Sequence, residues 1–223
     1  MYYLIYGILI ISILLYIYYI QFYRIKCQEQ IFIDDVIAEN KLRTGDMLLF
    51  KAYDNFNSII TTCYYGHVGI VYIENGIPML FEANATEGKH LMPHHNKRGI
   101  YLTPVETRVK KYKGRCFIKR LSQELTDEQI VNLKAFIDYS LENLAYEHSV
   151  VKSFFKKILR TELCDKNTNC GEITFLAMIV MGLLPIEQYD QYIAHHLKFV
   201  CYTDTGYEPN EALIEIIDHP YHD

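Results

Sequence analysis

Two side chains far apart in the chain, His67 and Cys170, are the pair that thiol-based acyl chemistry requires. His67 opens a run of apolar and β-branched residues, Val68 to Tyr72, which is typical of a strand. Cys170 follows Asn169, a residue type that caps helices, and opens a long apolar run typical of a helix. A free thiol has a pKa of ~8.5, and both a nearby imidazolium and a helix N-terminus lower it. The two residues are therefore candidates for base and nucleophile.

A third candidate, Glu82, lies on the strand expected after the hairpin signal Asn75-Gly76. It is a single carboxylate in an otherwise apolar segment, across a short hairpin from His67. Such a carboxylate would bond one imidazole nitrogen and leave the other nitrogen to face the thiol. The backbone N–H groups that begin the helix at Cys170 would hold a developing oxyanion. The candidates for a second oxyanion donor are Tyr64, Tyr65 and Asn169.

Each of the three residues also has a structural interpretation. A single cysteine on an apolar helix is often a small core residue. A histidine at a strand start often serves as a hydrogen-bonded structural group, and Glu82 would face solvent if its strand lay at the sheet edge. Residue chemistry alone leaves these interpretations open.

The segment from Tyr2 to Ile20 contains no charged side chain and is dominated by Ile, Leu and Tyr. As a helix it would rise ~28 Å at ~1.5 Å per residue, close to the ~30 Å of a bilayer's hydrocarbon core. A cleaved signal peptide fits less well, because no basic residue precedes the run and no small-residue cleavage site follows it. We expect a single-pass transmembrane helix. Arg24 and Lys26 flank its C-terminal end, which predicts a cytosolic location for the rest of the chain.

The composition of the chain argues against some classes of function, nucleic-acid binding among them. The chain has 223 residues and a formal net charge of −5, without a basic face that would neutralise nucleic-acid phosphates. The most basic stretch is expected to be a solvated loop and strand edge, with lipid headgroup contact as an alternative; it comprises Arg108, Lys110, Lys111, Lys113 and Arg115. The six cysteines of the chain are scattered singly, which suits a reducing compartment. We expect no cofactor and no metal site, since no C-x-x-C or H-E-x-x-H motif occurs.

The coarse pattern predicts an α+β domain with an antiparallel sheet packed on helices. Residues 1–23 are expected to be the anchor, 24–41 a connector and 42–223 the folded domain. Helices are predicted at 54–62, 126–144, 150–159 and 170–184, and strands at 47–50, 67–73, 78–83, 116–119 and 212–217. The polar segment 88–99 is expected to be a surface loop.

Four short motifs in this chain resemble the circularly permuted branch of the NlpC/P60 superfamily. The motifs are Thr44 to Phe50, Tyr65 to Tyr72, Phe81 to Ala83 and Asn169 to Glu172. The most similar group is the permuted papain-like amidases of the YaeF/YiiX type, which have relatives in poxviruses and other large DNA viruses. The resemblance implies a permuted papain-like fold over about Leu42 to Leu184, with Cys170 as nucleophile, His67 as base and Glu82 as the residue that orients the base.

A related branch, the lecithin:retinol acyltransferase-like proteins, carries the nucleophile motif Asn-Cys-Glu-His. Asn169-Cys170 matches the start of that motif, and Gly171-Glu172 departs from it. The amidase group commonly has Ser where this chain has Gly171. The resemblances imply a small peptide, amide or lipid acyl substrate.

We therefore expect a membrane-anchored cysteine hydrolase or acyl transferase that acts on an amide or ester bond. Two alternatives remain open: an inactive peptide- or lipid-binding module, and a structural membrane protein of a virion. The richness in Ile, Tyr, Asn and Lys indicates an AT-rich genome, compatible with a large DNA virus and with a virion or host membrane as the location.

Overall fold

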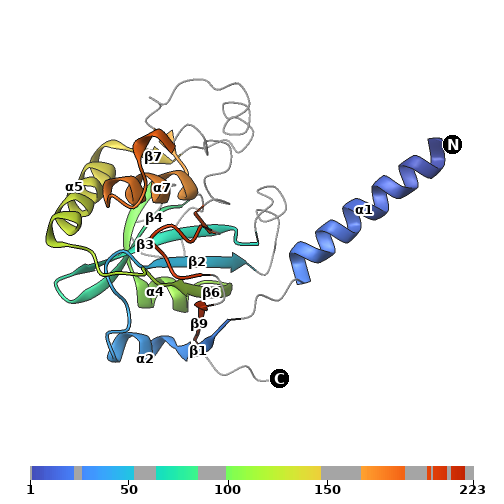
Figure 1. Ribbon diagram of the computed structural model, residues 1–223. Coiled ribbons are helices and arrows are strands. Elements are labelled where there is room, and N and C mark those ends of the chain that lie inside the picture. Colours follow the sequence, from blue (N-terminus) through green and yellow to red (C-terminus); the bar gives the residue numbers. More distant parts are fainter. Residues whose placement is uncertain are drawn as a thin grey trace.

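A mixed sheet with helices on both faces forms the body of the molecule (Figure 1). The computed structural model describes residues 2–22, 27–52, 64–84, 99–146, 167–188, 200–201, 203–209 and 212–218. In spatial order the seven strands are β1 (Glu29–Phe32), β9 (Ile214–Ile217), β6 (Gly114–Lys119), β2 (Met47–Ala52), β3 (His67–Glu74), β4 (Ile77–Asn84) and β5 (Gly99–Pro104). A separate short pair joins β7 (Ala145–Tyr146) to β8 (Asn167–Thr168).

Pairing in the large sheet is antiparallel, except that β1 runs parallel to β9. The hairpin between β3 and β4 turns at Asn75 and Gly76, which have φ values of 52° and 80°. Two successive positive φ values suit the right-handed twist of the flanking strands, and Asn-Gly adopts them at low cost. The predicted α+β class and this hairpin are therefore confirmed.

The two longest helices of the body begin at capping residues that the sequence indicates. Helix α5 (Asp127–Asn143) starts with a reciprocal capping box between Thr126 and Gln129. Helix α7 (Cys170–Val180) starts after Asn169, whose side-chain oxygen accepts a hydrogen bond from the Glu172 N–H at 3.0 Å. The shorter helices are α2 (Ile33–Ala38), α4 (Val105–Lys110) and the 3₁₀ turn η1 (Ile186–Gln188).

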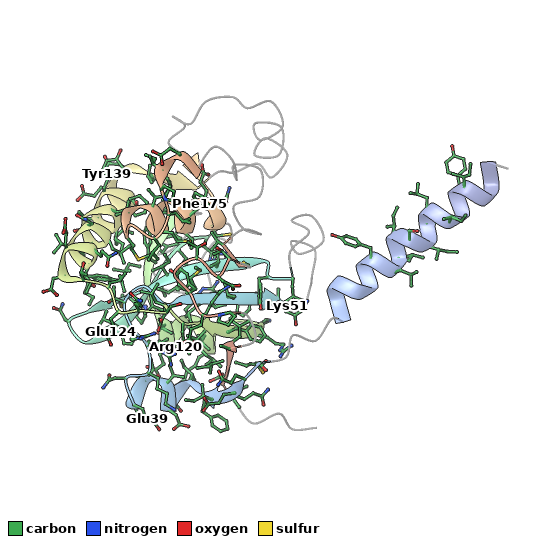
Figure 2. The ribbon with its side chains drawn as sticks, viewed as in Figure 1. Glu39, Lys51, Arg120, Glu124, Tyr139 and Phe175 are labelled. Carbon is green, nitrogen blue, oxygen red and sulfur yellow. The ribbon has the colours of Figure 1, made fainter. Side chains whose placement is uncertain are left out.

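Alternation along the strands divides the apolar core into two layers. Leu49, Val68 and Phe81 point to the face covered by α5 and α7, where Phe175 packs (Figure 2). Their neighbours in the strands point to the opposite face and pack with α2 and α4; they include Leu48, Phe50, Val71, Leu80 and Cys116. Because side chains of successive strand residues alternate between faces, a register shift by one residue would exchange the two cores.

The N-terminal segment forms α1 (Tyr2–Phe22), drawn apart from the sheet in Figure 1. The side chains described between Ile5 and Tyr16 are largely exposed. Within the residues that the structure describes, no helix combines the length and the apolar character needed to cross a membrane. The predicted helix is present, but a transmembrane span is not supported.

Several of the predicted elements differ from the structure or lie outside the residues that it describes. The segment expected as a connector supplies β1, which pairs with β9, and α2, whose Ile33 and Val36 are buried. Strand β5 and helix α4 were not predicted. The expected helices at 54–62 and 150–159 lie outside the described residues, as does nearly all of the expected loop at 88–99. The predicted strand at 212–217 is confirmed as β9.

A buried carboxylate, Asp46, ties the start of β2 to the end of β6. Its two oxygens accept hydrogen bonds from the Leu121 N–H at 2.9 Å and the Arg43 N–H at 3.0 Å. The guanidinium of Arg120, labelled in Figure 2, donates to Asp46 Oδ2 at 3.1 Å. Asp46 follows Gly45, whose φ of +98° is a conformation that L side chains rarely adopt. The Gly-Asp pair thus fixes the entry into the strand next to β3.

We expect Asp46→Ala to lower the free energy of unfolding by about 2–4 kcal/mol, because it leaves buried donors without their acceptor. Urea denaturation measures the change. Asp34→Ala is the matched control: Asp34 is 75% exposed and pairs with Lys110, so its removal changes stability by less than about 1 kcal/mol. Equal losses in the two variants would show that Asp46 does not organise this corner.

Candidate active site

His67 is the first residue of β3 and lies at one end of the sheet. It stands opposite Phe50 of β2 in the strand register, so the two side chains share the sheet face that α2 and α4 cover. The rings of His67 and Phe50 are 5.5 Å apart between centroids and tilted by 49°. The His67 side chain is 15% exposed, so an edge of the imidazole remains open to solvent.

Glu82 lies on β4, directly after Phe81, and its side chain is fully buried. Its Oε2 is 2.5 Å from Nε2 of His67. Because the register pairs Ile70 with Phe81, Glu82 is a diagonal neighbour of His67 on the same face. The carboxylate engages Nε2, which leaves Nδ1 as the ring nitrogen for another partner.

Cys170 is the first residue of α7, and its side chain is half-buried. Its sulfur is hydrogen-bonded to the His67 ring and also accepts hydrogen bonds from the backbone N–H groups of Val68 and Gly171. Asn169 caps the helix immediately before it. The structure therefore brings together all three residues that the sequence singles out, from β3, β4 and α7.

The paired register between β3 and β4 stops short of His67. The register between the two strands begins only at Ile70 and Phe81, whereas residues Glu82 to Asn84 pair with β5. The Val68 N–H near the open end is directed to the sulfur instead of a strand. Cys170 comes from the face covered by α7, and it meets His67 of the opposite face at this end of the sheet.

Gly69 permits the close approach of the two strands beside the site. A Cβ at this position would lie 2.8 Å from the Phe81 carbonyl oxygen and from the Leu80 side chain. Contacts of that length are repulsive, so a larger residue would push β4 away from β3. The glycine of the His-Val-Gly motif thereby helps to hold Glu82 within reach of His67.

The charges in the site favour an ion pair of thiolate and imidazolium. Burial alone would raise the pKa of the Cys170 thiol, but the His67 charge, the hydrogen bond from its ring and the two backbone N–H groups outweigh burial and lower it. Burial alone would lower the pKa of His67, but the charge and hydrogen bond of Cys170, followed by those of Glu82, raise it to about 9. Both shifts favour the state in which the sulfur is the negative partner and the ring the positive one.

Arg108 of α4 is a fourth member of the site that the sequence did not reveal. Its Nε donates to Glu82 Oε1 at 2.8 Å and to Oε2 at 3.1 Å. Burial alone would raise the pKa of Glu82; the charges and hydrogen bonds of Arg108 and His67 overcome it and lower the pKa to about 2. One feature of the sequence could have indicated that Arg108 is buried. Val105 and Val109 are spaced as on one face of a helix, and Arg108 lies beside that apolar face.

The predicted solvated loop for the basic cluster is therefore wrong for both of its arginines. Arg108 is buried, and Arg115 donates to Glu215 through Nε at 2.5 Å and Nη2 at 2.8 Å. Lys110 is more exposed and pairs with the surface carboxylates of α2 and α4. The arginines pair with internal carboxylates because burying either partner alone would leave a charge uncompensated.

The three predicted second oxyanion donors have other neighbours. The Asn169 side-chain oxygen caps α7. The Tyr64 hydroxyl accepts a hydrogen bond from Arg115 Nη1 at 3.1 Å. Tyr65 is fully buried, with its ring against Phe117 at 5.7 Å between centroids. The contacts of Asn169 and Tyr64 use their oxygen atoms as acceptors, so the second oxyanion donor stays a prediction.

The chain is similar to a solved structure at low sequence identity. No family model matches the chain, and no curated protein matches it. Among solved structures, the crystal structure of metalloprotein yiiX from Escherichia coli O157:H7 is similar with a TM-score of 0.46 and 16% identity. The similarity covers 79% of this chain and 97% of that chain. Among the described residues of the present chain, no group of three or more His, Cys, Asp and Glu is arranged to hold a metal ion.

The shifted pKa values predict how stability depends on pH. Glu82 has a lowered pKa, so its contribution is present above the ordinary value of 4.5 and disappears as the pH falls through about 2. His67 has a raised pKa, so its contribution is present below 6.5 and disappears as the pH rises through about 9. Cys170 has a lowered pKa, so its contribution has the opposite sign on the basic side and offsets that of His67; the loss of stability below pH 4.5 is therefore the change to measure.

We expect Glu82→Gln to lower the free energy of unfolding at pH 7 by about 3–5 kcal/mol, because Arg108 loses its buried partner. The difference from wild type should shrink as the pH falls from 4.5 toward 2, since the unfolded chain binds the Glu82 proton over that range before the folded protein does. Urea unfolding at several pH values measures it. A wild-type curve as flat on the acid side as that of Glu82→Gln would contradict the assignment of a lowered pKa to Glu82.

Proposed function

We propose that this protein is a cysteine hydrolase or acyl transferase with a permuted papain-like fold. The observation that carries the proposal is the convergence of the Cys170 sulfur, the His67 ring and the Glu82 carboxylate from three separate elements. The half-buried thiol and the partly exposed imidazole are accessible to a carbonyl group. A purely structural cysteine would instead resemble Cys116, which is buried and has a thiol pKa raised by burial.

In the first half of the proposed reaction, the Cys170 thiolate attacks the carbonyl carbon of an amide or ester. A carbon–sulfur bond forms, and the electron pair of the carbonyl double bond moves to oxygen, where the N–H groups at the start of α7 stabilise it. As the oxyanion collapses, the His67 imidazolium gives its Nδ1 proton to the leaving nitrogen or oxygen. The bond to the leaving group breaks, and a thioester on Cys170 remains.

In the second half, water attacks the thioester while neutral His67 takes its proton. The carbon–sulfur bond breaks, the acid leaves, and the thiolate and imidazolium are restored. An alcohol or amine in place of water would make the reaction an acyl transfer. Glu82 holds Nε2 throughout, which keeps Nδ1 directed at the sulfur and the substrate.

We also propose that the N-terminal segment attaches the protein to a membrane, with the folded domain in the cytosol. Support comes from the sequence, because the segment Tyr2 to Ile20 carries no charged side chain and Arg24 and Lys26 follow it. Attachment to lipid would make an acyl lipid a suitable substrate alongside peptides and other small amides. A virion membrane and a host membrane are the two proposed locations.

Selective alkylation tests the proposed nucleophile. We expect iodoacetamide at pH 7 to label Cys170 of the full-length protein at least about tenfold faster than Cys27. Cys27 is an internal control, since it too is half-buried, but burial and the nearby Glu215 raise its thiol pKa. Peptide mass spectrometry measures labelling at each site. His67→Ala should remove the preference for Cys170, and equal labelling of Cys27 and Cys170 in the wild type would exclude the thiolate.

Assays of the unlabelled protein and of Cys170→Ser distinguish an enzyme from a binding module and from a virion structural protein. An active hydrolase should release acid from at least one member of a panel of amides, esters and acyl lipids, and Cys170→Ser should abolish that release. A binding module would retain a ligand after Cys170→Ser without forming product. A virion structural protein would incorporate normally with the same substitution.

Membrane attachment has its own test. We expect the full-length protein expressed in cells to remain in the membrane pellet after alkaline carbonate washing. A variant with Ile10→Lys and Leu14→Lys should move to the supernatant, because a charge near the bilayer centre costs about 2.5–3.5 kcal/mol per residue. Wild-type protein in the supernatant would show that the segment is not an anchor.

A further inference from the structure

Arg108 approaches Glu82 from helix α4, on the side of the carboxylate away from α7. Both partners are nearly or fully removed from solvent, with Arg108 5% exposed and Glu82 0%. One nitrogen, Nε, bonds both carboxylate oxygens, at 2.8 Å and 3.1 Å. Oε2 is also the oxygen that holds Nε2 of His67. The arginine and the histidine therefore share one carboxylate.

Two aromatic rings hold the guanidinium in this position. Its central carbon lies 4.6 Å from the centroid of Phe50 and 5.0 Å from that of Tyr112. The Phe50 and Tyr112 rings pack edge to face at 4.9 Å. Phe50 also contacts the His67 ring, so one side chain supports both cations that bind Glu82. A planar guanidinium stacks on such rings, whereas a lysine ammonium would not reproduce the geometry.

When Cys170 is a thiolate, the charges of the site alternate in sign. They run from the Cys170 sulfur to the His67 imidazolium, the Glu82 carboxylate and the Arg108 guanidinium. Two negative and two positive charges give a neutral group, which reduces the cost of placing charges away from water. Without Arg108 the same group would carry a net negative charge and would tend to bind a proton.

We propose that Arg108 is a positioning residue of the active site, acting through Glu82 to keep the carboxylate ionised and fixed on His67. The proposal rests on the proposed function, because it assigns Arg108 a part in forming the reactive thiolate. Arg108 itself does not touch the sulfur or a substrate.

The other titratable groups around Glu82 cannot replace this charge. His67 of β3 loses its proton in each catalytic cycle, and Cys170 of α7 is negative when the site is ready. Cys116 of β6 and Tyr101 of β5 both have pKa values raised by burial, so they are neutral near pH 7. Among the described residues whose charge acts on Glu82, Arg108 is the one that stays positive throughout.

The test is the pH dependence of Cys170 alkylation by iodoacetamide in the full-length protein. In the wild type the midpoint should lie well below the ~8.5 of a free thiol. Arg108→Gln should raise that midpoint by about one unit, which lowers the labelling rate at acidic pH about tenfold. Arg115→Gln is the matched control: it removes an arginine that is 18% exposed from the buried Glu215 on the same sheet, and it should leave the midpoint unchanged.

A double-mutant cycle shows whether Arg108 acts through Glu82. With Glu82→Gln already present, adding Arg108→Gln should not move the midpoint further, since the carboxylate it supports is gone. A shift of equal size in both backgrounds would overturn the proposal, because Arg108 would then act on the thiol directly. So would a folded Arg108→Gln variant with a wild-type midpoint.

The role of Arg108 can still be tested if the Arg108→Gln variant alone does not fold. Removing both members of a buried ion pair is often tolerated where removing one is not, so Glu82→Gln with Arg108→Gln can be compared with Glu82→Gln. Unequal midpoints overturn the proposal, because Arg108 would then act on the thiol directly; equal midpoints together with a higher midpoint in Glu82→Gln than in the wild type support it. A wild-type midpoint near ~8.5 would instead refute the proposed function itself, and with it any role for Arg108.

Discussion

The carboxylate of Glu82 is completely removed from water, and its charge survives there because His67 and Arg108 both bind it. Breaking a buried ion pair by removing one partner costs about 3–5 kcal/mol, a large share of the stability of a typical domain. Strand β4, which carries Glu82, must therefore stay in register with β3 and under α4. The same constraint that stabilises this end of the sheet also orients the histidine toward the sulfur.

The site joins the two layers of the molecule at one end of the sheet, where β3 begins. His67, Glu82 and Arg108 belong to the face covered by α2 and α4, whereas Cys170 begins a helix on the opposite face. They meet where the register between β3 and β4 ends, because the N-terminus of α7 brings the Cys170 sulfur to the His67 ring there. A thiol placed in this way lies in the positive field of a helix N-terminus and beside an imidazolium, the two surroundings that favour a thiolate.

Local chemistry in the sequence was sufficient to predict the residues that begin elements. Asn169 and Thr126 predict the starts of their helices, and Asn75-Gly76 predicts the hairpin turn. The apolar residues around Glu82 make a carboxylate at that position unusual. Long-range pairing was not predictable, because nothing local states that β1 joins β9 or that Arg108 reaches Glu82. Arg108 lies in a basic stretch that resembles a solvated surface, and only the packing of α4 on the sheet reveals its buried partner. The expectation of a membrane span comes from the composition of the N-terminal segment. The helices that the structure describes do not support such a span.

The ionisation state of Cys170 is the property on which the proposed chemistry depends. Thiolates absorb in the ultraviolet where thiols do not, so the difference spectrum between wild type and Cys170→Ser, followed against pH, reports this one side chain while the tyrosines cancel. A thiolate signal that is already complete at neutral pH, with a midpoint well below ~8.5, is the predicted result. A midpoint at or above that value would mean that His67 and Cys170 do not form an ion pair, and the site would not be a thiol active centre.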